Sequence, residues 1–316
     1  MTTPGPAISV LIVTHNAAPH IADTVRSVLA QTFGDWEMIV VDDGSRDATL
    51  EILATFDDPR IVVLPQAHHG DWGHWRNVAA ADHATGTYIA PLDHDDIWLP
   101  DKLARQHAAL EATGAVMSYT AWALLHEDGR TSVVPRLRLD GDERADRLAM
   151  LGRTAGMLHS SFVMHRQAFL DAGGYRGDPR ISEVPLAHRL RGMGRFAEVD
   201  APLTLWRRHG AQTTRDEEGM AGIVVATLRA MAADPAEDQV IRDAAARLAD
   251  VTLARQLVGD RGRAGFRARV RRNPRALADW AWLLASYVPR SVMVRVRAIY
   301  QRRPRPRVRR QGAAHG

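Results

Sequence analysis

The sequence contains no cysteine, only one lysine (Lys102), and no long uncharged apolar run. Without cysteine the protein forms no disulfide bond and offers no thiolate to a metal. This excludes cysteine-based zinc sites and fits a reducing compartment. The longest apolar stretch near the C-terminus, residues 280–288, contains Ser286 and is far shorter than the roughly twenty residues that span a bilayer. The N-terminus leads directly into a strand-like run, so we expect no signal peptide and a cytoplasmic location.

Acidic residues are nearly absent from one end of the chain. Residues 261–316 contain 16 arginines and a single acid, Asp279, whereas residues 1–260 contain 25 basic and 36 acidic residues. Apolar residues of this basic end fall on one helical stripe, formed by Leu284, Val288, Val292, Val296 and Ile299.

A basic amphipathic helix of this kind lies on anionic lipid. Residues 280–310 therefore predict peripheral contact with the inner face of the plasma membrane. A solvated tail is the alternative, because Pro289 interrupts the stripe. No motif that reads a nucleic-acid groove accompanies the arginines, so we expect no nucleic-acid partner.

Strand-like and helix-like runs alternate through the first half of the chain. The strand-like runs are residues 8–13, 37–41 and 61–64, and the helix-like runs are residues 22–31, 49–55, 77–83 and 100–112. This alternation predicts an α/β fold with a mostly parallel central sheet, whose ligands bind beyond the carboxyl ends of the strands.

Further helical patterns cover residues 221–233 and 240–257. They place a domain boundary near residue 216, between a domain of residues 1–215 and a helical C-terminal region of residues 216–316 with the Arg-rich tail. Residues 136–147 are interpreted as a charged loop or a lid.

Two of the strand-like runs end in clusters of acids. Asp93, Asp95 and Asp96 follow one run, and Asp42 and Asp43 follow another about fifty residues earlier. Crowded carboxylates repel one another unless a cation lies among them. The pattern predicts one cleft with a divalent metal, and therefore phosphate chemistry.

Several motifs occur in an order and spacing that resemble the family 2 (GT2) glycosyltransferases of GT-A fold. They are residues 9–16 (SVLIVTHN), 27–32 (SVLAQT), 36–45 (WEMIVVDDGS), 76–77 (RN), 86–90 (GTYIA) and 92–98 (LDHDDIW). The resemblance covers about residues 7–215. It implies a GT-A fold and a nucleotide-diphosphate sugar donor bound at the C-terminal edge of the sheet.

The same resemblance implies contacts with the donor nucleotide. Thr14, His15 and Asn16 would lie under the nucleotide, and Asp43 would accept a hydrogen bond from the base. The pair at residues 76–77, Arg76 with Asn77, would approach the nucleotide or its diphosphate.

The resemblance also implies a metal site. Asp93 and Asp95 form a D-x-D signature, in which Asp95 would bind the metal directly and Asp93 would lie near the ribose or the metal. His209 matches the end of the family's closing strand and would touch the diphosphate or the metal. Either Mg²⁺ or Mn²⁺ would stabilise the leaving diphosphate as a Lewis acid.

A base is needed to take the proton of the acceptor hydroxyl. Aligning Leu186, Arg189 and Leu190 with the family pattern without a gap places Glu183 where the family has a catalytic aspartate. A one-residue gap would place Val184 there instead, and the protein would then be inactive or use another group.

The residues and the resemblance together predict an inverting, metal-dependent transfer of a sugar to an acceptor hydroxyl. The acceptor is not identified, and its pathway would be cell-surface polysaccharide, glycolipid or other glycoconjugate synthesis. Two alternatives stay open: a nucleotidyltransferase, and a non-catalytic, membrane-associated module of glycosyltransferase type.

Overall fold

The computed structural model describes residues 5–134, 137–139, 141–152, 157–210, 212 and 217–256. Residues 280–310, the predicted membrane contact, lie outside this part of the chain. Spatial contacts group the chain up to Thr252 into one compact unit, and the domain boundary near residue 216 stays a prediction. Among the described helices, none is both long and apolar enough to cross a membrane.

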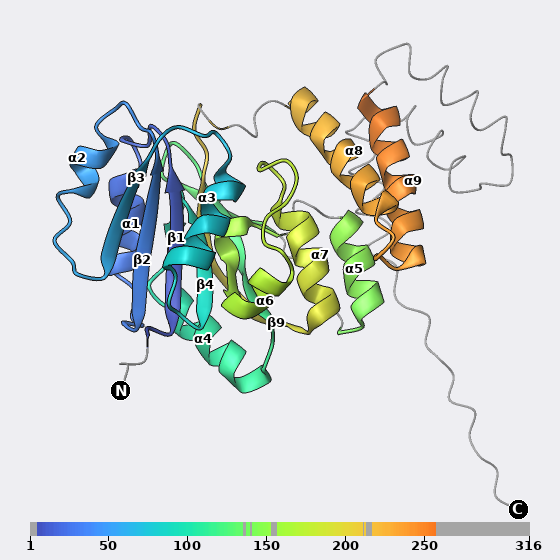
Figure 1. Ribbon diagram of the computed structural model, residues 1–316, viewed down its shortest axis with the longest axis horizontal. Helices are drawn as coiled ribbons and strands as arrows, with labels where there is room; N and C mark the ends of the chain where they lie inside the picture. The colour runs from blue at the N-terminus through green and yellow to red at the C-terminus, as the bar shows by residue number, and fades with distance from the viewer. Residues whose placement is uncertain are drawn as a thin grey trace, which may run out of the picture. The chain divides into compact units, whose positions relative to one another are not determined.

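Strands and helices alternate along the described chain (Figure 1). The strands are β1 (Ile8–Thr14), β2 (Trp36–Asp43), β3 (Ile61–Gln66), β4 (Tyr88–Asp93), β5 (Ile97–Trp98), β6 (Met117–Leu125), β7 (Thr131–Val134), β8 (Phe162–His165) and β9 (Phe196–Arg207). The α-helices are α1 (Ile21–Leu29), α2 (Thr49–Leu53), α3 (Trp72–Val78), α4 (Lys102–Thr113), α5 (Glu143–Gly152), α6 (Arg166–Asp171), α7 (Glu183–Met193), α8 (Glu217–Ala233) and α9 (Gln239–Gln256). A π-helical turn, η1 (Ala79–His83), continues α3, and a 3₁₀ turn, η3 (His159–Ser161), precedes β8.

The described strands form one mixed sheet in the order β3-β2-β1-β4-β8-β6-β9-β5, with β7 paired to β6. The long pairings, of β1 with β2 and β4, of β2 with β3 and of β6 with β9, are parallel. The shorter pairings made by β5, β7 and β8 are antiparallel. The prediction of a mostly parallel α/β sheet is therefore confirmed.

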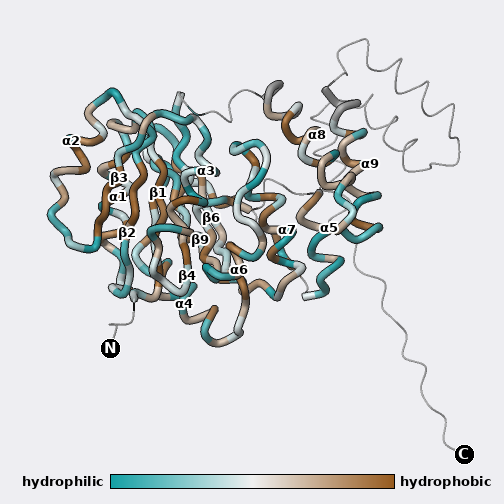
Figure 2. The backbone as a smooth tube through the Cα atoms, in the orientation of Figure 1, coloured by the Kyte–Doolittle hydropathy of each residue, from teal (hydrophilic) through white to brown (hydrophobic). Residues whose placement is uncertain are grey.

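Strand β1 is buried on both faces, as expected for a central strand of a parallel sheet. Ile8, Val10 and Ile12 pack with α1, α2 and α4, whereas Leu11 and Val13 belong to the core that contains α6 and α7. Figure 2 shows the resulting hydrophobic colouring of the central strands. The last residues of β1 thus lie at the carboxyl edge of the sheet, between a face covered by α1, α2 and α4 and a face covered by α6 and α7.

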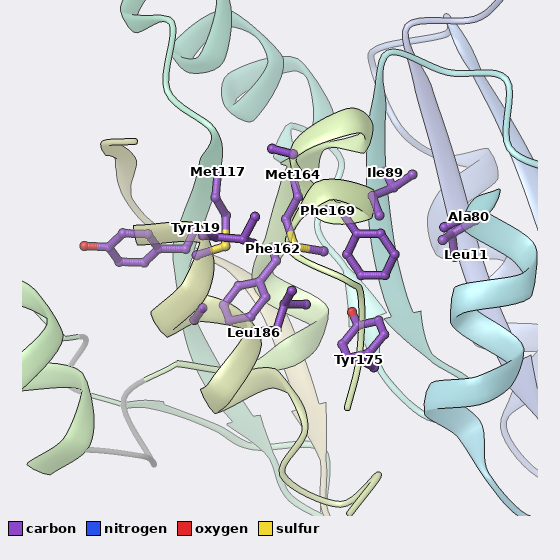
Figure 3. Packing of buried hydrophobic residues seen from close by; sticks show 14 of the residues in the cluster. Leu11, Ala80, Ile89, Met117, Tyr119, Phe162, Met164, Phe169, Tyr175 and Leu186 are labelled. Carbon is purple, nitrogen blue, oxygen red and sulfur yellow. The ribbon is translucent and has the colours of Figure 1, made fainter. Parts of the chain in front are cut away.

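The core that contains α6 and α7 supports the later part of the sheet. It includes Phe162 and Met164 of β8, Phe169 of α6 and Leu186 of α7 (Figure 3). Tyr175 packs edge-on against Phe169 at 5.3 Å between ring centroids. This packing fixes the loop that carries Tyr175 next to the start of α7.

The interpretation of residues 136–147 as a charged loop was wrong for its second half, because α5 begins at Glu143. The charges there stabilise the helix. Arg147 lies 3.3 Å from Glu143 at the favourable i, i+4 spacing, and the carboxylate of Asp146 accepts two hydrogen bonds from Arg191 of α7, at 2.9 and 3.0 Å.

Candidate active site

A cleft of about 600 Å³ opens beyond the carboxyl ends of β1 and β4. Seven of the predicted site residues line it: His15, Asn16, Arg76, Asp93, Asp95, Glu183 and His209. Thr14, Asp43 and Asn77 are not among its lining residues. Several of these side chains lie close together because β2, β1 and β4 are parallel neighbours, so their carboxyl ends meet at one edge of the sheet.

Asp93 ends β4 and faces two basic side chains. The Arg76 guanidinium donates a short hydrogen bond to Oδ1 of Asp93, and Nδ1 of His159 lies 3.4 Å from the same oxygen. Burial opposes ionisation of Asp93, but Arg76 and His159 outweigh it and hold the pKa of Asp93 below its ordinary value. Asp93 is therefore a carboxylate with its charge already balanced by the protein.

Asp95 has a different partner. Its Oδ2 lies 2.8 Å from Nε2 of His209, and its backbone carbonyl accepts a hydrogen bond from Nε of Arg207 at 3.1 Å. The 2.8 Å separation is close to that of two neighbouring ligands on one Mg²⁺ or Mn²⁺, since bonds of about 2.1 Å at right angles give about 3 Å. A carboxylate oxygen and an imidazole nitrogen thus fit a divalent cation.

Asp96 is buried and points to protein groups. Ser160 Oγ donates to its Oδ2 at 2.6 Å, and the backbone N–H of Arg207 donates to its Oδ1 at 3.3 Å. Burial, with Asp95 and Asp93 nearby, raises the pKa of Asp96 well above its ordinary value. The raised pKa reflects the cost of holding three acids close together, which the two hydrogen bonds donated to Asp96 partly offset.

Glu183 occupies the first position of α7, after Ser182. Its side chain is half-buried and lines the same cleft. Burial raises the pKa of Glu183 to about 7, and Asp93 adds to the rise, whereas a backbone hydrogen bond and Arg76 oppose it. A carboxylate with this pKa is suited to accept a proton near neutral pH.

Asp43 is fully buried and organises the segment between β3 and α3. Its carboxylate accepts hydrogen bonds from the N–H groups of His69 and Gly70 at 2.5 and 2.9 Å and from Nε1 of Trp75 at 2.8 Å. Burial opposes ionisation of Asp43, but these hydrogen bonds outweigh it and lower its pKa. Contact with a base stays a prediction.

His15 and His68 stack over the same turn at 4.3 Å. Together with Asp43 they form the group of three potential metal ligands that is found among the described residues. However, Nδ1 of each ring lies within 3.0 Å of the Asp43 backbone carbonyl, to which it can donate. These nitrogens are thus used in positioning the turn.

Asn77 and Thr14 support the cleft from behind. The Asn77 amide donates to the carbonyl of Tyr175 at 2.9 Å and accepts from its N–H at 2.8 Å, which ties α3 to the loop before α7. Thr14 is buried at the end of β1, next to Asp42 of β2 in the sheet register. Nucleotide contact by either residue stays a prediction.

Sequence reasoning missed His159 and Tyr175. Nε2 of His159 makes a short hydrogen bond with the Tyr175 hydroxyl, and the Arg76 guanidinium lies 5.8 Å from the Tyr175 ring centroid. Burial and the Arg76 charge lower the pKa of His159. No motif marks these residues, because they come from segments far from Asp93 in the chain.

Comparison with protein families gives one match relevant to this cleft. The model of the family described as "Glycosyl transferase family 2" matches residues 9–173, which include the cleft residues His15, Arg76 and Asp95.

Curated relatives match shorter parts of the chain. The putative teichuronic acid biosynthesis glycosyltransferase TuaG of Bacillus subtilis (strain 168) is 40% identical over 131 residues, which are 41% of this chain and 52% of the relative. The UDP-Glc:α-D-GlcNAc-diphosphoundecaprenol β-1,3-glucosyltransferase WfgD of Escherichia coli is 32% identical over 121 residues, 38% of this chain and 47% of the relative. This chain thus spans about half the length of these relatives.

Among solved structures, the mannosyltransferase PcManGT from Pyrobaculum calidifontis, in complex with GDP-Man and Mn²⁺, has a TM-score of 0.58. The match covers 95% of this chain and 89% of that chain, at 18% sequence identity. It shows a common fold, and the predicted GT-A fold is thereby confirmed.

Proposed function

Because this chain belongs to glycosyl transferase family 2, we propose that it transfers one sugar from a nucleotide-diphosphate sugar to an acceptor hydroxyl, with inversion of the anomeric carbon. The observation that carries the proposal is the composition of the cleft. Glu183, a carboxylate that can take a proton, lines the same cleft as Arg76 and the Asp95–His209 pair, which can hold a charged diphosphate and its cation.

In this mechanism Glu183 removes the proton from the acceptor hydroxyl as the oxygen attacks the anomeric carbon. The bond from that carbon to the diphosphate oxygen breaks at the same time, and the nucleoside diphosphate leaves with the bonding electrons. A single displacement from the opposite face inverts the configuration. Arg76 lies beside Asp93 at the cleft wall and would position the donor.

Asp95 and His209 would hold the divalent cation, with Asp93 facing the donor. A bound cation supplies Lewis-acid stabilisation of the charge that develops on the leaving diphosphate. We favour Mn²⁺ over Mg²⁺, because Mg²⁺ is usually bound through carboxylates and water, whereas an imidazole nitrogen suits transition metals better. The Mn²⁺ in the complex of PcManGT is consistent with this choice.

The proposed pathway is the synthesis of a cell-surface polysaccharide or related glycoconjugate at the cytoplasmic face of the membrane. TuaG is named for teichuronic acid biosynthesis, and WfgD for transfer to a sugar on diphosphoundecaprenol. An acceptor on diphosphoundecaprenol is anchored in a membrane. Contact of the basic segment 280–310 with that membrane would bring the protein to such an acceptor.

A panel of nucleotide sugars, screened by thermal stabilisation with and without Mn²⁺, tests the function and selects the donor. We expect one donor to raise Tm in the presence of Mn²⁺ and Asp95→Asn to abolish the metal-dependent part of the rise. Asp57→Asn, which alters an exposed acid outside the cleft, is the control. Metal-dependent stabilisation that survives in Asp95→Asn would refute the assignment of the site.

A binding module without catalysis gives a different result. It would bind the selected donor, neither hydrolyse nor transfer it, and be unaffected by Glu183→Gln.

A further inference from the structure

The lining of the cleft consists of two chemically different sets of residues. The charged set comes mainly from β4, from α3 and from the start of α7. The second set is apolar and comes from β6, β9, the segment just before η3, α7 and α8. It includes Trp122, Met157, Leu158, Val184, Trp206, Met220 and Val224.

Two tryptophans form the rigid part of this apolar wall. Trp122 of β6 and Trp206 of β9 pack edge to face, with ring centroids 5.8 Å apart and planes at 89°. Trp206 directly precedes Arg207, which bonds to Asp95 and Asp96. The wall is therefore continuous along β9 with the residues that would hold the diphosphate.

Helix α8 supplies the adaptable part of the wall. Met220 and Val224 are four residues apart and therefore lie on one face of the helix. Both are half-buried and line the cleft. Methionine adapts its shape to irregular apolar ligands, so this face suits an occupant without a fixed outline.

The polar residues that line the cleft near this wall bond to the protein itself. Gln212 donates to the carbonyl of Arg207 at 2.5 Å and accepts from the N–H of His209 at 3.3 Å. Arg180 is paired with Asp178 at 2.8 Å. Described polar side chains here thus serve the fold, and the surface left for a ligand is largely apolar.

We propose that the acceptor carries a hydrocarbon group next to its sugar, and that this group lies against Trp206, Trp122 and the Met220–Val224 face of α8. The inference rests on the proposed function, in which the donor diphosphate takes the charged set of residues and the acceptor takes the rest of the cleft. An apolar wall of this kind gains free energy by removing hydrocarbon from water. A sugar ring has fewer apolar atoms to bury against this wall than a hydrocarbon chain has.

Methyl, hexyl and octyl β-D-glucosides, each below its micelle concentration, provide the test. Their binding to the full-length protein is measured by calorimetry in the absence of donor. They share one head group, so the dependence on chain length reports the apolar wall alone. We expect affinity to rise about fourfold per methylene while the chain stays in the cleft.

Two variants and one control locate the effect. Trp206→Ala and Met220→Ala should remove most of the dependence on chain length. Met193→Ala, which shortens a methionine that is 44% exposed and outside the cleft, should leave it unchanged. Met220 belongs to a surface helix, so its variant serves if Trp206→Ala does not fold.

Equal affinity for methyl and octyl glucosides would overturn the proposal and favour a platform for sugar rings. An unchanged dependence in Met220→Ala would also overturn it. Because the series needs no donor, these outcomes are independent of the donor screen. If no donor binds but affinity still rises with alkyl chain length, the proposed function is refuted and the apolar binding site is not.

Discussion

The three carboxylates of residues 93–96 have three different environments. Arg76 forms an ion pair with Asp93 and His159 lies 3.4 Å from it, His209 faces Asp95, and Ser160 bonds to a buried Asp96. The pKa of Asp93 is lowered and that of Asp96 is raised. Residues that look equivalent in the sequence are therefore an anion paired with arginine, a metal-ligand candidate and a structural acid.

At the same scale, Glu183 as the proposed base should make the transfer rate depend on pH. Its pKa is about 7, and the base is the ionised form. The rate should therefore fall about tenfold per pH unit below pH 7. Glu183→Gln should lower the rate by about 10² to 10⁴ and remove this pH dependence. The exposed Glu51→Gln, in α2, should change neither, and a matching pH profile in Glu183→Gln would contradict the role.

Ionisation of Glu183 has opposite effects on the two quantities: it raises the transfer rate and lowers the stability of the folded state. Folded protein keeps the Glu183 proton up to about pH 7, whereas the unfolded chain loses it near 4.5. The folded state thus binds more protons at Glu183 between these values, and the contribution of Glu183 to stability decreases as pH rises through the window. Glu183→Gln should lack this decrease in urea unfolding. If Glu183 were only structural, its substitution would not change the pH dependence of the rate and the pH dependence of stability at the same pKa.

At the scale of elements, the segment from His159 to Phe162 is anchored through three consecutive carbonyls. Nε1 of Trp98 donates to Ser160 O at 2.7 Å, the Gln106 amide to Ser161 O at 3.0 Å, and Nζ of Lys102 to Phe162 O at 3.5 Å. These donors come from β5 and α4. They hold η3 in place, so His159 is presented to Asp93.

The chain offers a matched pair of variants for this anchor. Trp98 and Trp36 are both 2% exposed, but Nε1 of Trp36 has no hydrogen-bond partner within the described part of the chain. Both substitutions, Trp98→Phe and Trp36→Phe, remove an indole nitrogen and some volume. Only the first breaks a hydrogen bond, and it should cost about 1–2 kcal/mol more in free energy of unfolding. Equal losses in urea titrations would show that the anchor adds nothing.

Most of the elements could be predicted from local patterns. The buried runs of β1 and β2 and the Gly114 end of α4, where φ is 61°, follow from hydrophobicity and backbone preference. Strand β5 has only two residues, too few to show the alternation of apolar and polar side chains that predicts a strand. Helix α5 was missed because two of its charged residues pair with distant segments, Asp146 with Arg191 of α7 and Arg147 with Glu237.

At the scale of the molecule, the site is assembled by the sheet order. The acids were predictable because each cluster directly follows an apolar strand, and Glu183 was reached through the resemblance. His159, Tyr175, Trp122 and Trp206 were not predictable as site residues, because the pairing of β8 and β9 with earlier strands places them there. Sequence patterns report neighbours along one strand, whereas these contacts depend on strand order.

The anomeric configuration of the product tests the central claim most directly. With the donor selected by the panel, the first-formed product is analysed by proton NMR before it can mutarotate. A single displacement with Glu183 as base predicts a configuration opposite to that of the donor in every turnover. A product that retains the donor configuration would contradict the account, because retention requires a second displacement or a different mechanism.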